Sequence, residues 1–299
     1  LTACYFGVLV GKGLIDPQGM VVQYLPELQG TAWEGCRVRD VLDMRAGTRF
    51  DESNYDDPQS DGRLIEEVSG YRPRTHAGLP KDTYAWIKQV QNIREHGGMF
   101  EYRSLLTDVL AWMMEAVTGK PFAAGFAHDV WSQMGAEQDA EIIVDEAGFP
   151  VVEGGICATA RDFARFGLMC LKNGQIDGQS GGQLGGQSGG QLGSKQVLPA
   201  DWLARLRKPD ADLIAAYTAS QGLDAAMPDS CYCDQWWVLD PTAGIYSAYG
   251  IHGQQLFIHH PSQTVVAKFS TWPTALSALE LQDAGMFAIC ERLGGEGRR

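Results

Sequence analysis

The spacing of apolar residues changes along the chain, from the period of a helix in the first two thirds to the alternation of a strand in the last third. Residues 1–10 are almost wholly apolar and are followed by Gly11 and Gly13, which is typical of a buried helix stopped by glycine. The same reasoning predicts further helices over residues 38–44, 82–93, 121–134, 199–206 and 275–293.

Two more helices have clear local signals. The helix after Tyr102 is expected to end at Gly119, because glycine readily adopts the left-handed conformation that closes a helix. Its interior face is defined by four apolar residues: Leu106, Leu110, Met113 and Val117. Thr159 is the predicted cap of the next helix, and the acid Asp162 in the first turn suits the helix dipole.

Strand patterns occur mainly in the last third. Residues 235–239, 255–259 and 264–270 are predicted strands, and a short strand is expected earlier at 141–144. The last two strands flank Pro261-Ser262-Gln263 and are predicted to pair as an antiparallel hairpin. Helices first, followed by a hairpin and a final helix, indicate an α+β fold with an antiparallel sheet.

Two stretches show neither the helical nor the strand spacing of apolar residues. Residues 49–80, rich in Asp, Gly, Pro and Arg, are predicted to be surface loops. The octapeptide at 178–185 recurs at 186–193, and each copy matches a Gly-x-Ser-x-Gly nucleophile elbow. These matches are interpreted as chance, because an elbow needs a strand before it and a helix after it. The predicted regions are a mostly helical region over 1–172, a flexible insert over 173–194, and a sheet-and-helix region over 195–299.

Composition excludes some classes of partner. With 44% hydrophobic and 20% charged residues among 299, the chain suits one large or two closely packed domains. A net charge of −13 argues against nucleic acid and against an anionic membrane surface. The odd number of scattered cysteines favours reduced thiols and a cytoplasmic location. Cys4, Cys157, Cys170 and Cys290 are predicted core residues, and Cys231-Tyr232-Cys233 lacks the spacing of a zinc site.

Several segments occur in a characteristic order. They are Val41-Leu42-Asp43-Met44 with Tyr55-Asp56-Asp57-Pro58, Tyr102-Arg103-Ser104 with Thr107-Asp108-Val109-Leu110-Ala111-Trp112, residues 154–162, Gln235-Trp236-Trp237, and Gly250-Ile251-His252-Gly253-Gln254. In this order they resemble the β-lactamase-related serine hydrolases, and most closely the 6-aminohexanoate-oligomer (nylon-oligomer) hydrolases and related carboxylesterases. The resemblance implies a β-lactamase/transpeptidase-like fold, with an antiparallel sheet flanked by helices beside a mostly helical region.

The resemblance also implies acyl transfer through a covalent serine ester. The serine and lysine of a Ser-x-x-Lys motif lie one helical turn apart, and a tyrosine shuttles the proton. A free tyrosine has a pKa of about 10, so it needs a nearby cation to act as a base near neutrality. By resemblance Tyr102 takes this role, Ser104 is the third position of its motif, and the backbone N–H of Ile251 contributes to the oxyanion hole. Taken alone, Tyr102 would be an aromatic residue packed at a helix start.

A small-molecule ester or amide substrate is implied in the same way, without a cofactor or a metal. Tyr55, Glu66 and Glu153 fall where nylon-oligomer hydrolases carry substrate-contacting groups. Glu153 is a departure, since an asparagine is expected before the paired glycines. An added negative charge changes which end of a substrate is tolerated.

Further substrate contacts are expected from the last third. Trp236 and Trp237 alternate faces of a strand, so only one can line a pocket, and Trp237 is the predicted one. Gly250 lets a substrate approach the strand edge, at the position of the β-lactamase Lys-Thr-Gly strand. His252 is expected to line or support the site, although a lone histidine is often structural.

No serine in this sequence is followed three positions later by a lysine. Aligned by pattern, that pair would end two residues before Leu1, so the first helix is expected to be the remainder of the nucleophile helix, with the N-terminal strands of the sheet also missing. Two hypotheses follow: a truncated esterase or amidase that is inactive as given, or a non-catalytic relative that uses its cleft for binding or as a scaffold. A cysteine hydrolase based on Cys157 lacks a neighbouring histidine pattern.

Overall fold

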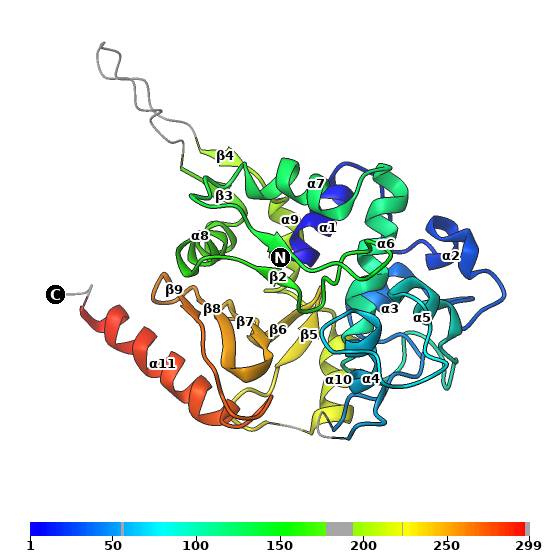
Figure 1. Cartoon of the computed structure of the whole chain (residues 1–299). Coiled ribbons are helices and arrows are strands. Elements are labelled where there is room, and N and C mark those ends of the chain that lie inside the picture. The colour runs from blue at the N-terminus through cyan, green and yellow to red at the C-terminus, as the bar shows by residue number, and fades with distance from the viewer. Residues whose placement is uncertain (55–56, 178–193, 223, 297–299) are drawn as a thin grey trace, which may run out of the picture.

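The computed structural model describes residues 1–54, 57–177, 194–222 and 224–296. Tyr55 and both Gly-x-Ser-x-Gly matches lie outside the described residues, as does most of the predicted insert. The described part consists of a helical region and a five-stranded antiparallel sheet that lie side by side, as Figure 1 shows.

The helical region is built around α1. Its elements are α1 (Thr2–Gly11), α2 (Val21–Tyr24), η1 (Pro26–Leu28), α3 (Val38–Leu42), α4 (Asp61–Val68), α5 (Thr83–Gln89), α6 (Leu105–Thr118), α7 (Phe122–Phe126) and the π-helical turn η2 (Ala127–Trp131). Residues 2–9 of α1 are all buried, as its apolar sequence predicts. The Tyr5 ring lies edge-on to Phe122 and Phe126, with centroids 5.7 and 6.2 Å apart. Burial on all sides places α1 in the core.

The main sheet has the order β5-β6-β7-β8-β9, and every pair is antiparallel. Its strands and the elements that follow them are β5 (Cys231–Cys233), β6 (Trp236–Asp240), β7 (Ile245–Gly250), the short 3-10 turn η3 (Ile251–Gly253), β8 (Gln254–His259), β9 (Thr264–Lys268) and α11 (Leu279–Glu296). The connecting segment contributes β1 (Glu141–Ile142), β2 (Ile156–Cys157), α8 (Ala160–Leu171), β3 (Gln175–Ile176), β4 (Lys195–Gln196), α9 (Ala200–Arg205) and α10 (Ala211–Gln221).

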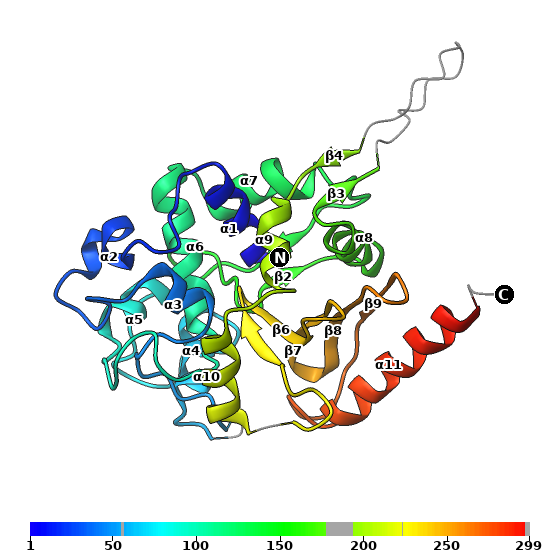
Figure 2. The same ribbon diagram turned by 180° about the vertical axis from the view of Figure 1, so that it is seen from behind.

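Helices cover both faces of this sheet. Helix α8 packs closely on β8 and β9 through Gly167, where a Cβ atom would lie 2.5 Å from Val265 Cγ1 and 2.9 Å from Leu256 Cδ1. Helix α11 covers the other face, where Met286 and Cys290 join a small core cluster with Phe257 (Figure 1). Viewed from behind in Figure 2, α10 runs beside β5, at the edge of the sheet that faces the helical region.

A two-residue turn joins β5 to β6. Cys233 pairs with Trp236, and the intervening Asp234 and Gln235 have φ values of 48° and 65°. Two successive left-handed residues match the twist of a tight hairpin, although Asn-Gly is the usual sequence. Here the side chains compensate: Thr107 Oγ1 donates to Gln235 Oε1 at 2.7 Å, and Gln235 Nε2 donates to the carbonyl oxygen of Val41 at 3.2 Å. Tertiary contacts therefore hold a turn that its own sequence does not favour.

Several predicted elements are confirmed. The first helix corresponds to α1, and the helix after Tyr102 corresponds to α6, which ends at Gly119 with a φ of 64°. Thr159 caps α8 by accepting the backbone N–H of Asp162 at 3.2 Å. The predicted terminal hairpin is formed by β8 and β9.

Other predictions were wrong in part. Helix α4 lies inside the 49–80 stretch predicted to be loops, because Ser60 caps it and its apolar residues Ile65 and Val68 face the core. Helix α5 ends at Gln89 rather than at residue 93. Helix α10 was not predicted, since its low amphipathicity gives no helical pattern. Helix α11 runs over Leu279–Glu296 rather than 275–293, and the predicted core residue Cys157 is exposed.

Candidate active site

Tyr102 lies immediately before α6, against a cluster of aromatic rings. Its ring stacks on Trp237, with centroids 5.7 Å apart and an interplanar angle of 26°, and lies edge-on to Tyr232 at 5.9 Å. Trp237 also contacts Tyr249 of β7 at 5.9 Å. Two ring contacts thus lead from Tyr102 to the end of β7, where Gly250 and Ile251 follow.

The two tryptophans of β6 face opposite ways, as strand alternation requires. Trp236 is 2% exposed and packs edge-on to Tyr246 in the core. Trp237 is half-buried and meets Tyr102. The structure therefore places Trp237, and not Trp236, beside the candidate tyrosine.

Ser104 is held by a carboxyl group from the 49–54 segment. Its backbone N–H donates to Glu52 Oε1 at 2.9 Å. Burial raises the pKa of Glu52 to about 7, although hydrogen bonds from Ser104 favour its charged form. Arg103 is fully buried below this pair and donates to the carbonyl oxygen of Ala46 at 2.8 Å. The start of α6 is thus fixed from two sides.

A pair of acids lies one helical turn further along α6. Asp108 is 1% exposed, and its Oδ1 accepts the N–H of Val152 at 3.0 Å. This contact brings the next residue, Glu153, against α6, where burial raises its pKa to about 7. On the other side, Thr2 Oγ1 donates to the carbonyl oxygen of Val152 at 3.4 Å. The N-terminal end of α1 therefore meets the same backbone segment.

His252 has a backbone role in the structure. Its φ of 59° is left-handed, and its N–H donates to the carbonyl oxygen of Ala275 at 2.9 Å. Its Nδ1 lies 2.9 Å from the carbonyl oxygen of Trp272; because a carbonyl only accepts, Nδ1 carries the proton. These bonds tie the turn after Gly250 to the segment that follows β9.

Glu66 is turned to the surface side of α4. It forms ion pairs with Arg63 and Arg72, which use its charge locally. Tyr71 lies closer to the acidic pair: Glu153 and Asp108 are among the groups that raise the pKa of its phenol, after burial. Of the predicted substrate-contacting residues in the helical region, Tyr55 lies outside the described residues.

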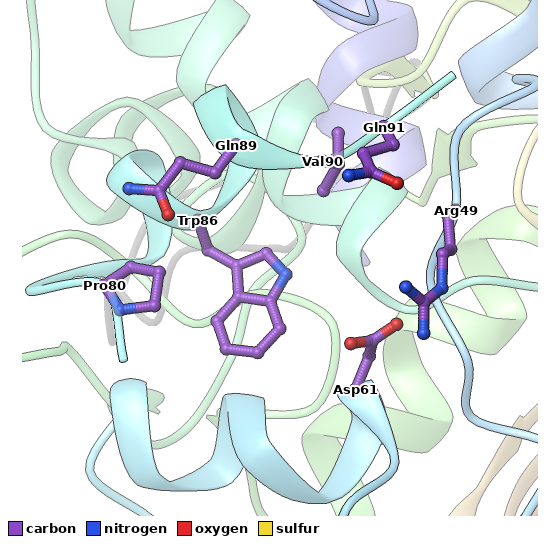
Figure 3. A pocket seen from close by; sticks show the side chains of 7 residues that line it. All are labelled: Arg49, Asp61, Pro80, Trp86, Gln89, Val90 and Gln91. Atoms are coloured by element: carbon purple, nitrogen blue, oxygen red, sulfur yellow. The ribbon is translucent and has the colours of Figure 1, made fainter. Parts of the chain in front are cut away.

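A hollow of about 200 Å³ opens elsewhere on the helical region, as Figure 3 shows. Its wall includes the Trp86 indole, with Arg49 and Asp61 at one side. None of the predicted site residues lines it. It is smaller than a typical ligand pocket and is separate from the Tyr102 cluster.

Two statements on metal sites and membrane spans hold for residues 1–54, 57–177, 194–222 and 224–296. Within them, His, Cys, Asp and Glu side chains form no group of three or more that could hold a metal ion. Among the described helices, none has both the length and the apolar character needed to cross a membrane.

Comparison with known proteins gives the family. A family model described as Beta-lactamase matches residues 1–286, which is nearly the whole chain. The chain belongs to the beta-lactamase family. A 6-aminohexanoate-dimer hydrolase from Paenarthrobacter ureafaciens is 35% identical over 269 residues, which are 89% of this chain and 62% of that relative. The chain thus spans less than two thirds of that relative's length.

Solved structures of beta-lactamase relatives share the fold. A protein from Bacillus anthracis, assigned as a 6-aminohexanoate-dimer hydrolase, superposes with a TM-score of 0.80 at 24% identity, over 98% of this chain and 71% of its own. A penicillin-binding protein from Bacillus halodurans superposes with a TM-score of 0.61 at 15% identity, over 96% of this chain and 83% of its own. A family VIII carboxylesterase superposes with a TM-score of 0.60 at 15% identity, over 97% of this chain and 80% of its own. The predicted β-lactamase/transpeptidase-like fold is confirmed.

Sequence reasoning missed three residues beside the candidate site. Glu52 stood in a stretch predicted to be loops, and nothing local marked it. Tyr232 was considered only as part of a rejected metal motif. Asp108 did carry a signal, because it is an acid inside an apolar helix, four positions after Ser104 and therefore on the same face.

Proposed function

We propose that this chain provides the acyl-binding and proton-transfer part of a serine hydrolase that acts on small carboxylic esters or amides through an acyl-enzyme. The main support is the Tyr102 cluster: a phenol fixed against Trp237, beside Ser104, and linked through Tyr249 to the end of β7. Membership in the beta-lactamase family supports the same reaction class.

Each residue has a proposed role. Tyr102 transfers the proton between nucleophile and leaving group, and Ser104 supports it as the third residue of the motif. The N–H of Ile251 stabilises the oxyanion, a contribution of about 3 kcal/mol to the barrier in comparable sites. Trp237 and Gly250 form the wall and the edge along which the acyl group lies. His252 supports that edge through its bonds to the following segment.

Substrate selection is proposed to depend on the acids of the helical region. Glu153 replaces an uncharged amide, so it favours a substrate that offers a hydrogen-bond donor or positive charge at that end. Glu66 is a further proposed substrate contact, and Tyr55, which lies outside the described residues, stays a predicted one. The relative from Paenarthrobacter ureafaciens is a 6-aminohexanoate-dimer hydrolase, which makes a linear amide a suitable first substrate to test.

The 299 residues contain no Ser-x-x-Lys sequence, so we expect the chain alone not to hydrolyse esters. The first test compares this chain with a chimera in which the N-terminal part of the Paenarthrobacter relative precedes Leu1. On p-nitrophenyl acetate, the chain alone should give only the uncatalysed rate and the chimera a clear turnover.

Tyr102→Phe in the chimera is the matched control. It keeps the ring and removes the hydroxyl, so kcat should fall about 100-fold or more while the fold is retained. An active Tyr102→Phe chimera would contradict the role of Tyr102. A chimera that folds and binds substrate analogues without turnover would favour the second hypothesis, a non-catalytic binding protein or scaffold.

A further inference from the structure

Asp108 and Glu153 meet in a place where neither forms an ion pair with a Lys, Arg or His of the described residues. Asp108 comes from α6 and is almost fully buried. Glu153 follows Val152, whose N–H donates to Asp108 Oδ1 at 3.0 Å, so the backbone brings the two side chains together. The two carboxyl groups are within hydrogen-bonding contact of each other. The groups that shift the pKa values of the two acids most include no Lys, Arg or His.

One carboxyl oxygen is left without a donor. Glu153 Oε2 is buried, and no N–H or O–H of the described residues reaches it. Two ionised carboxylates can only accept hydrogen bonds, so contact between them forms no hydrogen bond and adds like-charge repulsion. A proton on one of them removes the repulsion and supplies the missing donor.

We infer that Asp108 and Glu153 hold one proton between them in the folded protein, and that Asp108 is a positioning residue that sets the charge and orientation of Glu153 beside the proposed site. Asp108 then serves as the donor and Glu153 as the acceptor. Glu153 keeps its single negative charge, with its direction fixed by α6. This deepens the proposed function, and its relevance to substrate selection rests on that function.

The surroundings favour retention of the proton. The titratable groups whose charges interact with the pair include Glu52, Tyr71 and Tyr84. Each of these groups is neutral or negative, so none offsets a second negative charge on the pair. Burial, followed by the charge of Glu153, raises the pKa of Asp108 well above its usual value. Loss of the shared proton is therefore opposed by both desolvation and repulsion.

The sign of the pH effect follows from linkage. Both acids bind protons more strongly in the folded chain than in the unfolded chain. The native state therefore holds more protons above about pH 4, and the pair should make the protein less stable as pH rises toward about 8. Glu153→Gln should flatten this part of the profile, since a Gln amide can donate to Asp108 without a titrating proton.

The decisive measurement is carboxyl-carbon NMR of the full 299-residue chain, labelled at Asp and Glu, between about pH 4 and 9. Asp108 and Glu153 are assigned through Asp108→Asn and Glu153→Gln. In the wild type, both carbons should respond to two shared transitions. In Asp108→Asn, which donates permanently, the upper transition should be lost and Glu153 should titrate in a single step.

Glu52→Gln is the matched control. It removes a neighbouring acid that also titrates near neutrality, so it should leave the two-step behaviour of the pair intact. Carbons that are both ionised throughout the range, or a Glu153 that still titrates in two steps in Asp108→Asn, would overturn the inference. If Asp108→Asn does not fold, the titration of the wild type and the pH dependence of stability of Glu153→Gln still test the inference. None of these measurements depends on catalysis. An inactive chimera would therefore count against the proposed function and not against the shared proton.

Discussion

At the scale of single residues, Trp237 has the largest influence on the candidate site. Besides Tyr102 and Tyr249, its ring contacts Phe100, Tyr217 and Tyr232. These partners come from the segment before α6, from α10 and from β5. One side chain therefore fixes three separate parts of the chain, and the position of Tyr102 depends on it.

Trp237→Ala should remove these contacts and leave a cavity, and so lower the free energy of unfolding by about 3 kcal/mol. Trp237→Phe keeps an aromatic ring at the same position and should lower the free energy of unfolding by about half as much. Urea unfolding followed by circular dichroism measures both. Equal stability of the Ala and Phe variants would show that the ring contacts contribute little.

At the scale of elements, the β5–β6 turn shows tertiary contacts overriding local preference. Asp234 and Gln235 occupy positions that favour Asn and Gly. Their side chains bond to α3 and α6, and these bonds stabilise the turn. The hairpin that presents Trp237 is thereby attached to the helix that begins just after Tyr102.

Gln235→Gly separates the effect of the backbone conformation from the effect of the side-chain hydrogen bonds. Glycine relieves a left-handed φ, a gain of about 1 kcal/mol, but loses the bonds to Thr107 and Val41, each worth about 1 kcal/mol. The variant should therefore be less stable by about 1 kcal/mol. Thr107→Val, which removes one of these bonds and leaves the turn unchanged, is the control. A more stable Gln235→Gly variant would mean that backbone strain dominates.

At the scale of the whole molecule, a buried ionic network joins the helical region to the sheet. Arg205 of α9 donates to Asp43 Oδ2 at 3.1 Å and to Asp234 Oδ2 at 3.0 Å, and Arg39 of α3 also pairs with Asp234. Both acids are almost fully buried. Charges in such a place require their partners, because water cannot reach them.

Arg205→Met should leave two carboxylates incompletely paired and destabilise the protein by about 3 to 5 kcal/mol. Arg205→Lys keeps the positive charge but cannot donate to both carboxylates as a planar guanidinium does. It should therefore destabilise the protein less than Arg205→Met. Because the network spans both regions, unfolding followed by far-ultraviolet circular dichroism and by tryptophan fluorescence should coincide in the wild type. Separate transitions would indicate that the regions unfold independently.

Periodicity, together with stop, cap and turn residues, predicted α1, α6, the Thr159 cap and the terminal hairpin, because each depends on residues within a few positions of one another. The family resemblance, based on the order of short motifs, predicted the fold and proposed Tyr102. It could not predict that Trp237 would contact Tyr102, although strand alternation limited the choice to one of two tryptophans. The candidate site as a whole remains a prediction, and the structure shows only which of its members meet.

The sequence by itself determined the local elements and the family of this protein. Tertiary structure decided which distant segments meet the start and the first turns of α6: Asp108 meets Val152 across a separation of 44 residues, and Glu52 meets Ser104 across 52. The physical reason is that propensity and spacing act over single turns and strands. The pairing and protonation of buried carboxyl groups depend on which distant segments the core brings into contact.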